Sequence, residues 1–129
     1  MTNVMQQHGA FSWCELMTTN TTASKEFYSR LFGWEIVDRP VEGMMYSVLN
    51  VGDLGVGGLM AMPPDMAGIP PHWGVYVTVD DVDAAAKLVE DLGGQIKYPP
   101  SDIPDVGRFA VIQDPQGAVL SIISYPSNS

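Results

Sequence analysis

The chain has 129 residues, 46% apolar and 16% charged, which suits a single globular domain over residues 1–129 because about 100 to 200 residues form one compact core. Fifteen acidic against six basic residues give a net charge of −9, and such a surface repels the phosphate backbone of nucleic acids. No stretch approaches the roughly 18 consecutive apolar residues of a membrane span. The sequence therefore predicts neither a nucleic-acid partner nor membrane insertion.

The N-terminal stretch and the single cysteine bear on where the chain works. Residues 1–10 lack the basic start and the apolar centre of a secretory signal, so a cytoplasmic location is expected. Cys14 is the only cysteine, which rules out an internal disulfide and a cysteine metal cluster. We expect it to be a small buried hydrophobic residue.

The first half of the chain predicts a strand, a helix and three more strands. The first strand is expected at Phe11–Thr18, before the helix-capping cluster Thr19–Thr22. Apolar residues then recur every four positions, which predicts an amphipathic helix with Ala23, Phe27 and Leu31 on its buried side and its end at Gly33. The other strands and turns are expected at Trp34–Arg39, Glu42-Gly43, Met45–Val51, Gly52-Asp53 and Val56–Met62.

The second half repeats this order after a linker rich in Pro and Gly at residues 63–71. A helix is expected at Val82–Leu92, with one apolar side formed by Val82, Ala85, Leu88, Val89 and Leu92. Strands are expected at Trp73–Val79, Gln95–Tyr98, Arg108–Gln113 and Ala118–Tyr125, with a Pro-rich loop from Pro99 to Gly107 and a tight turn at residues 114–117.

The two halves are related by a constant offset. Placing Leu31 on Leu92 gives an offset of 92 − 31 = 61, which also places Ala23 on Ala84 and Phe27 on Leu88. The sequence therefore predicts an α+β fold of two βαβββ modules, at about residues 10–62 and 72–126. We expect eight strands in curved sheets around a cleft, with the two helices outside.

Three stretches, in this order, resemble the vicinal oxygen chelate superfamily, which includes the glyoxalases, bleomycin-resistance proteins and extradiol dioxygenases. They are residues 27–35 (FYSRLFGWE), 77–82 (VTVDDV) and 107–117 (GRFAVIQDPQG). The resemblance covers about residues 10–125 and implies the same two-module fold. Metal-dependent members carry a His, Gln or Glu ligand on the first and last strand of each module.

The resemblance places these four ligand positions at Trp13, Gly58, Gly74 and Ser121, which offer neither a carboxylate nor an imidazole. A divalent metal needs such nitrogen or oxygen donors. A shift of two residues would bring in Glu15 and His72 but leave the fourth and eighth strands without ligands. We therefore expect no metal and no other cofactor.

In place of a metal cage, the predicted cleft is aromatic and apolar. Trp13 is positioned to stack on a flat ligand, Gly58 and Gly74 leave space beside it, and Met60 and Tyr76 follow on the same strand faces. A packing role for Trp13 in the core is the alternative. The expected ligand-binding residues are Trp13, Glu15, Gly58, Met60, His72, Gly74, Tyr76, Arg108 and Ser121.

Glu15 is the acidic residue of the first strand, and a buried carboxylate needs a partner. Arg108 and His72 are the predicted partners. In an apolar cleft the pKa of Glu15 would rise, which would suit a general base, whereas a structural ion pair is the alternative. The sequence thus favours a metal-independent binder of an apolar or aromatic small molecule, as in the bleomycin-resistance branch. The other reading is a metal-independent isomerase or lyase with Glu15 as catalytic base, and in both the chain is expected to form a homodimer.

Overall fold

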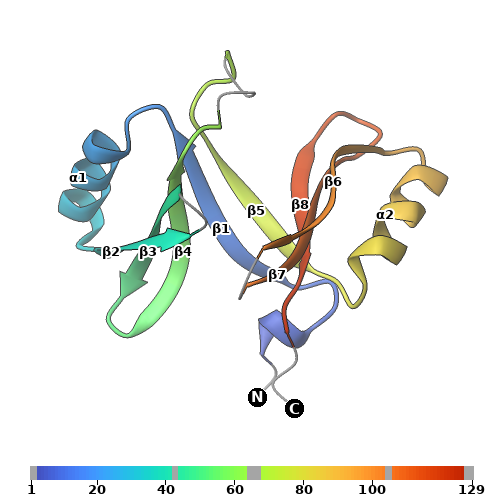
Figure 1. Ribbon diagram of the computed structural model, residues 1–129, viewed down its shortest axis with the longest axis horizontal. Helices are drawn as coiled ribbons and strands as arrows, with labels where there is room; N and C mark the ends of the chain where they lie inside the picture. The colour runs from blue at the N-terminus through green and yellow to red at the C-terminus, as the bar shows by residue number, and fades with distance from the viewer. Residues whose placement is uncertain (1–2, 42–43, 64–67, 104–105, 127–129) are drawn as a thin grey trace. The chain divides into compact units, whose positions relative to one another are not determined.

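The computed structural model describes residues 3–41, 44–63, 68–103 and 106–126. The chain separates into two compact units, which we call the N-terminal unit (Trp13–Gly74) and the C-terminal unit (Met1–Ser12 with Val75–Ser129). Within the described residues there are eight strands, two α-helices and one short 3-10 helix, Val4–Gln6 (Figure 1). The predicted turn at Glu42-Gly43 and residues 64–67 of the predicted linker lie outside the described residues.

The N-terminal unit has one strand, one helix and three strands in chain order. These are β1 (Phe11–Thr18), α1 (Thr21–Phe32), β2 (Glu35–Val41), β3 (Met44–Val51) and β4 (Leu54–Ala61). Their order across the sheet is β2-β3-β4-β1, with antiparallel pairing except between β1 and β4, which run parallel. The helix α1 therefore serves as the crossover that returns the chain to a strand direction shared with β1.

The same pattern recurs in β5 (His72–Thr78), α2 (Val82–Asp91), β6 (Gln95–Ile103), β7 (Gly107–Gln113) and β8 (Val119–Ser124). These elements belong to the C-terminal unit except for the first three residues of β5, which belong to the N-terminal unit. The order across these strands is β5-β8-β7-β6, and β5 runs parallel to β8. The predicted α+β class and the two βαβββ modules are confirmed. That both modules form a single domain stays a prediction.

The helix ends follow the capping residues that the sequence supplies. The side chain of Asn20 accepts a hydrogen bond from the Ala23 amide at 3.0 Å, and that of Asp81 accepts one from the Ala84 amide at 3.1 Å. Both bonds satisfy amides that the first helical turn leaves unpaired. Helix α1 ends at Gly33, whose φ of 73° is left-handed, a conformation that glycine adopts without strain.

Each sheet buries one face against its own helix. In the N-terminal unit this core contains Leu16, Leu49 and Leu59, with Tyr28 of α1 and Trp34 packed against it. In the C-terminal unit it contains Val79, Val82, Ala110 and Ile122. The opposite face of each sheet, which we call the helix-distal face, carries the alternate residues of the same strands.

The buried sides of the helices differ from the prediction. In α1 the side chains of Phe27 and Leu31 are 59% and 57% exposed. The reason is that Tyr28, the next residue along the helix, stacks on Trp34, so the side of the helix that carries Tyr28 faces the sheet. In α2 the buried residues are Val82 and Ala86, whereas Leu88 and Leu92, predicted on the buried side, are exposed.

Two further predictions need correction. Cys14 is exposed, because the core under α1 begins one alternate position later, at Leu16. Strand β6 continues to Ile103, through the first part of the segment predicted as a Pro-rich loop. It tolerates the two prolines because it is an edge strand whose register with β7 shifts between Tyr98 and Ser101.

Candidate functional site

The helix-distal face of the N-terminal unit brings together residues from β1, β3 and β4. In the β1–β4 ladder Glu15 is directly opposite Gly58, and in the β3–β4 ladder Tyr46 is directly opposite Met60. Directly paired residues lie on the same side of a sheet. Trp13 precedes Glu15 by two positions, so it lies on this face too.

A chain of hydrogen bonds links three of these side chains. The indole Nε1 of Trp13 donates to the Tyr46 hydroxyl at 2.8 Å, and that hydroxyl donates to Oε2 of Glu15 at 2.7 Å. We call Trp13, Tyr46 and Glu15 the relay. Glu15 is 8% exposed, so the phenol supplies hydrogen bonding that a buried carboxylate would otherwise lose with its water.

Tyr46 was missed by the sequence reasoning. The need of Glu15 for a partner was predicted, but the predicted partners were Arg108 and His72. A tyrosine two strands away in the sheet becomes a neighbour only once the register of β3 against β4 is known, and that register contains a shift between Leu49 and Asn50. The available signal was a tyrosine within a strand next to a glycine-rich one.

The space beside Gly58 is occupied by the Tyr46 side chain and is not open. A Cβ added at Gly58 would overlap the hydroxyl and ring atoms of Tyr46, so the phenol fills the room that the sequence assigned to a ligand. At Gly74 the nearest atom to an added Cβ is the Glu15 carbonyl oxygen at 3.9 Å, which leaves space there. An added Cβ at Gly55 would lie 3.8 Å from the indole of Trp13.

The remaining predicted residues of the N-terminal unit are less closely tied to the relay. Met60 is 8% exposed and pairs with Met17 of β1 as well as with Tyr46. His72 lies at the start of β5, with Nδ1 3.0 Å from the Pro70 carbonyl oxygen. Its ring is thus engaged by the backbone of the preceding loop.

The C-terminal unit has a matching pair at the equivalent position. Tyr76 of β5 is directly opposite Ser121 of β8, as Glu15 is opposite Gly58, and Tyr76 is 7% exposed. On the same side of the sheet, Tyr98 stacks on Phe109 with ring centroids 5.4 Å apart. This face therefore carries hydroxyl and aromatic groups where the N-terminal unit has a carboxylate.

Arg108 is engaged by two carboxylates of its own unit. Its guanidinium donates to both oxygens of Asp83 at 2.9 and 3.0 Å and to Asp102 at 3.0 Å. The hydrogen bonds from Arg108 hold the pKa of Asp83 below its usual range, and the same pairs raise the pKa of the guanidinium. The positive charge of Arg108 is therefore already balanced by Asp83 and Asp102. Its predicted role in ligand binding stays a prediction.

The described residues do not fit a divalent metal. They contain no group of three or more His, Cys, Asp or Glu side chains that could hold an ion. On the helix-distal face of the N-terminal unit, the indole of Trp13 and the phenol of Tyr46 form a chain of hydrogen bonds that ends at the carboxylate of Glu15. Tyr46 also fills the space in which a ligand side chain at position 58 would stand. Indole nitrogen is a donor only and cannot bind a cation as imidazole does.

The comparisons with known proteins agree on the family. The model of the Glyoxalase/Bleomycin resistance protein/Dioxygenase superfamily matches residues 10–122. The chain is 42% identical, over 93% of its length, to "Putative glyoxylase CFP32" of Mycobacterium tuberculosis. It is 34% identical, over 89% of its length, to the anthracycline biosynthesis protein DnrV of Streptomyces peucetius. The chain spans 46% and 41% of these two relatives, so it corresponds to a little under half of each.

Solved structures share the fold at low sequence identity. Methylmalonyl-CoA epimerase from Mycobacterium tuberculosis superposes with a TM-score of 0.68 at 15% identity, covering 98% of this chain and 93% of that one. The hypothetical protein BH1468 from Bacillus halodurans superposes with a TM-score of 0.70 at 12% identity, covering 95% and 99%. Identities this low carry the fold alone.

Proposed function

Because the chain belongs to the Glyoxalase/Bleomycin resistance protein/Dioxygenase superfamily, we propose that it is a metal-independent protein that binds an apolar or aromatic small molecule against the helix-distal face of its N-terminal unit. The relay carries this proposal. The half-buried indole of Trp13 is held in place by the Tyr46 phenol and offers a rigid stacking surface. The carboxylate of Glu15 at the other end of the relay offers one polar group that would orient the ligand.

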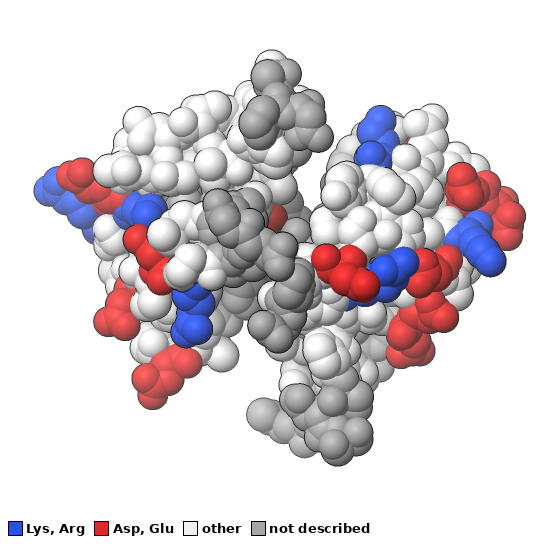
Figure 2. Space-filling model, viewed as in Figure 1, with Lys and Arg blue, Asp and Glu red and all other residues white. Residues whose placement is uncertain are grey.

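A small molecule suits the charge distribution better than a nucleic acid does. The chain carries −9 overall, and on the face shown in Figure 2 the basic side chains are interspersed with acidic ones and gather in no large patch. Within the described residues no helix is long and apolar enough to cross a membrane. A cytoplasmic location stays a prediction of the sequence.

The proposed ligand class is a planar aromatic compound. Stacking on an indole needs only a flat π-surface and is worth roughly 1 to 3 kcal/mol. Two relatives are named for anthracycline biosynthesis, and anthracyclines contain a flat fused-ring system that such a surface would accept. The open position at Gly74, 61 residues after Trp13 in the duplicated pattern, would leave room beside the ring.

Binding can be tested by titrating the protein with a panel of planar aromatic compounds, including an anthraquinone, while following tryptophan fluorescence and heat of binding. Trp13→Ala should weaken binding by roughly 1 to 3 kcal/mol, or about 5- to 150-fold. The matched control is Trp73→Ala, because Trp73 contacts Tyr28 and Trp34 on the helix side. Equal losses in both variants, or a stoichiometric divalent metal in elemental analysis, would contradict the proposal.

A second function is favoured by the position of Glu15. A buried carboxylate whose Oε2 is oriented by Tyr46 is arranged as a general base for an isomerase or lyase. Under this alternative Glu15→Gln should reduce turnover about 100-fold or more and leave ligand affinity within about tenfold. Under the binding proposal no turnover is detected with any ligand of the panel, and Glu15→Gln changes affinity only for ligands that carry a donor or a positive charge.

A further inference from the structure

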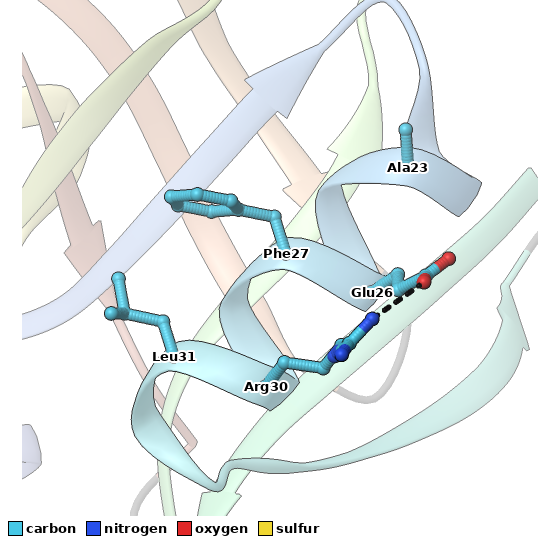
Figure 3. Close-up of a pocket in the computed structure, with 5 residues that line it drawn as sticks. All are labelled: Ala23, Glu26, Phe27, Arg30 and Leu31. Atoms are coloured by element: carbon cyan, nitrogen blue, oxygen red, sulfur yellow. Dashed lines mark hydrogen bonds and ion pairs between the residues drawn. The ribbon is translucent and has the colours of Figure 1, made fainter.

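The outer side of α1 carries an apolar stripe that nothing in the described part of the N-terminal unit covers. It consists of Ala23, Phe27 and Leu31, spaced four residues apart, and we call it the α1 stripe. Phe27 is 59% and Leu31 57% exposed, and Figure 3 shows both side chains projecting from the same side of the helix over a shallow pocket. Exposed apolar area of this kind is typical of an interaction surface.

One edge of the α1 stripe is charged. Glu26 and Arg30 line the same pocket and form an ion pair at 3.4 Å, with side chains 68% and 80% exposed (Figure 3). They follow Ala23 and Phe27 by three positions each, so both lie on one flank of the stripe. The flank thus presents a negative charge nearer the N-terminus of the helix and a positive charge nearer its C-terminus.

We propose that the α1 stripe is the contact by which two copies of this chain pair, with the two α1 helices antiparallel about a twofold axis near Phe27. In an antiparallel pair the same flank of each helix meets. Glu26 of each copy then faces Arg30 of the other, so the charges match twice. Along the stripe Phe27 meets its own counterpart, and the small Ala23 meets the larger Leu31 of the other copy. A twofold contact needs this self-complementarity.

The charge order on the second helix disfavours a mixed contact between α1 and α2. An offset of 61 places Glu26 on Lys87 and Arg30 on Asp91, and the equivalent apolar residues Leu88 and Leu92 are exposed too. The order of charges on α2 is therefore the reverse of that on α1. An antiparallel contact between α1 and α2 of another copy would set Glu26 against Asp91 and Arg30 against Lys87, which is repulsive twice.

The overall charge sets a further condition. Two copies that each carry −9 repel one another, so they can pair only where the contact is locally balanced. The flank of α1 meets this condition with one acid and one base. A contact formed mainly by a 12-residue helix buries less than the roughly 1,200 Å² of a standard interface, so we expect a weak dimer with a dissociation constant on the order of tens of micromolar.

Sedimentation velocity over roughly 1 to 200 µM spans this range and should show a shift from monomer to dimer. Glu26→Arg sets two arginines against each other across the axis and should raise the dissociation constant about tenfold or more, as should Arg30→Glu. The double variant Glu26→Arg with Arg30→Glu restores both pairs and should dimerise like the wild type. An equimolar mixture of the two single variants should form a heterodimer.

The controls separate loss of pairing from loss of folding. Lys87→Glu changes the equivalent charge on α2 and should leave the dissociation constant unchanged. Phe27→Glu should abolish the dimer without lowering the melting temperature measured at about 1 µM, where the chain is mainly monomeric. A wild type that stays monomeric at about 200 µM, or a folded double variant that fails to regain the dimer, would overturn the proposal. Neither result bears on ligand binding at the relay.

Discussion

The two units use the same architecture and differ in the chemistry of their helix-distal faces. At the centre of this face the N-terminal unit places Glu15 beside Gly58, whereas the C-terminal unit places Tyr76 beside Ser121 at the equivalent pair. The cores against the helices are aliphatic in both units. The two units thus share an aliphatic core between helix and sheet and differ on the opposite face.

The difference also concerns how tightly neighbouring side chains depend on one another. In the N-terminal unit a glycine makes room for a phenol from the next strand, and that phenol holds both an indole and a carboxylate. In the C-terminal unit the residue equivalent to Gly58 is Ser121, which carries a side chain. We therefore expect substitutions around the relay to have larger effects than matched substitutions elsewhere.

The largest effect should come from Gly58→Ala. The added methyl group overlaps Tyr46, so the phenol must move and both relay hydrogen bonds break, which should lower the free energy of unfolding by about 2 to 4 kcal/mol. Gly74→Ala, where an added Cβ has no atom nearer than 3.9 Å, should change it by less than about 1 kcal/mol. Urea denaturation at neutral pH measures both.

A double-mutant cycle tests the cause. In a Tyr46→Ala background the methyl group at position 58 meets no phenol, so most of the cost of Gly58→Ala should disappear. If the cost is the same in both backgrounds, Gly58 is required by the strand itself and the coupling to Tyr46 is wrong.

The next effect concerns the hydroxyl of Tyr46 alone. Tyr46→Phe keeps the ring and removes one hydrogen-bond donor to a buried carboxylate, so we expect a loss of about 1 to 3 kcal/mol in the free energy of unfolding. The matched change is Tyr125→Phe in the C-terminal unit, where the hydroxyl bonds only to Ser12, at 2.9 Å, among the contacts described here. It should lose about 1 kcal/mol or less. Equal losses would show that the relay has no special weight.

The helix caps should be equal in the two units. Asn20→Ala and Asp81→Ala each remove one side-chain acceptor from a first-turn amide and should each lower the free energy of unfolding by about 1 kcal/mol. Thermal unfolding followed by circular dichroism measures both. A much smaller loss for Asn20→Ala would indicate that α1 is held by its aromatic contacts rather than by its cap.

Much of the fold could be predicted because its signals are local. Caps such as Asn20 and Asp81 mark where the helices begin, and the offset of 61 residues shows the duplication. The exposed side of α1 could not be predicted from spacing, since Tyr28 and Phe27 are adjacent and either could face the sheet. The choice depends on stacking between Tyr28 and Trp34, which is a tertiary contact.

The candidate site was predictable only in part for a similar reason. Alternation along β1 places Trp13 and Glu15 on one face, and the cost of burying a carboxylate predicts a partner. The partner itself lies on β3, and its position depends on a register shift that no local pattern marks. The interpretation of Gly58 as open space failed because the side chain that fills it comes from that same strand.

The smallest expected effect is a pH dependence of the N-terminal unit that arises at Asp38. The Ser47 hydroxyl donates a hydrogen bond to Asp38 at 2.6 Å, and the Lys25 ammonium donates another to Asp38 at 3.0 Å. The bond from Ser47, which is the larger cause, and the bond from Lys25, which is the second, hold the pKa of Asp38 below its usual range. A carboxyl whose pKa is lowered by folding adds stability above its unfolded pKa, about 4, and that stability is lost as the pH falls through the folded value. The Asp38 side chain is 48% exposed, so solvent screening should keep the effect below about 1 kcal/mol.

Asp38→Asn should therefore lower the urea midpoint slightly at pH 7 and reduce the fall in midpoint between about pH 4 and pH 2. Asp83→Asn, which removes the carboxylate whose pKa Arg108 lowers in the C-terminal unit, should act in the same direction. An unchanged acid slope in Asp38→Asn would show that water replaces Ser47 and Lys25 without loss.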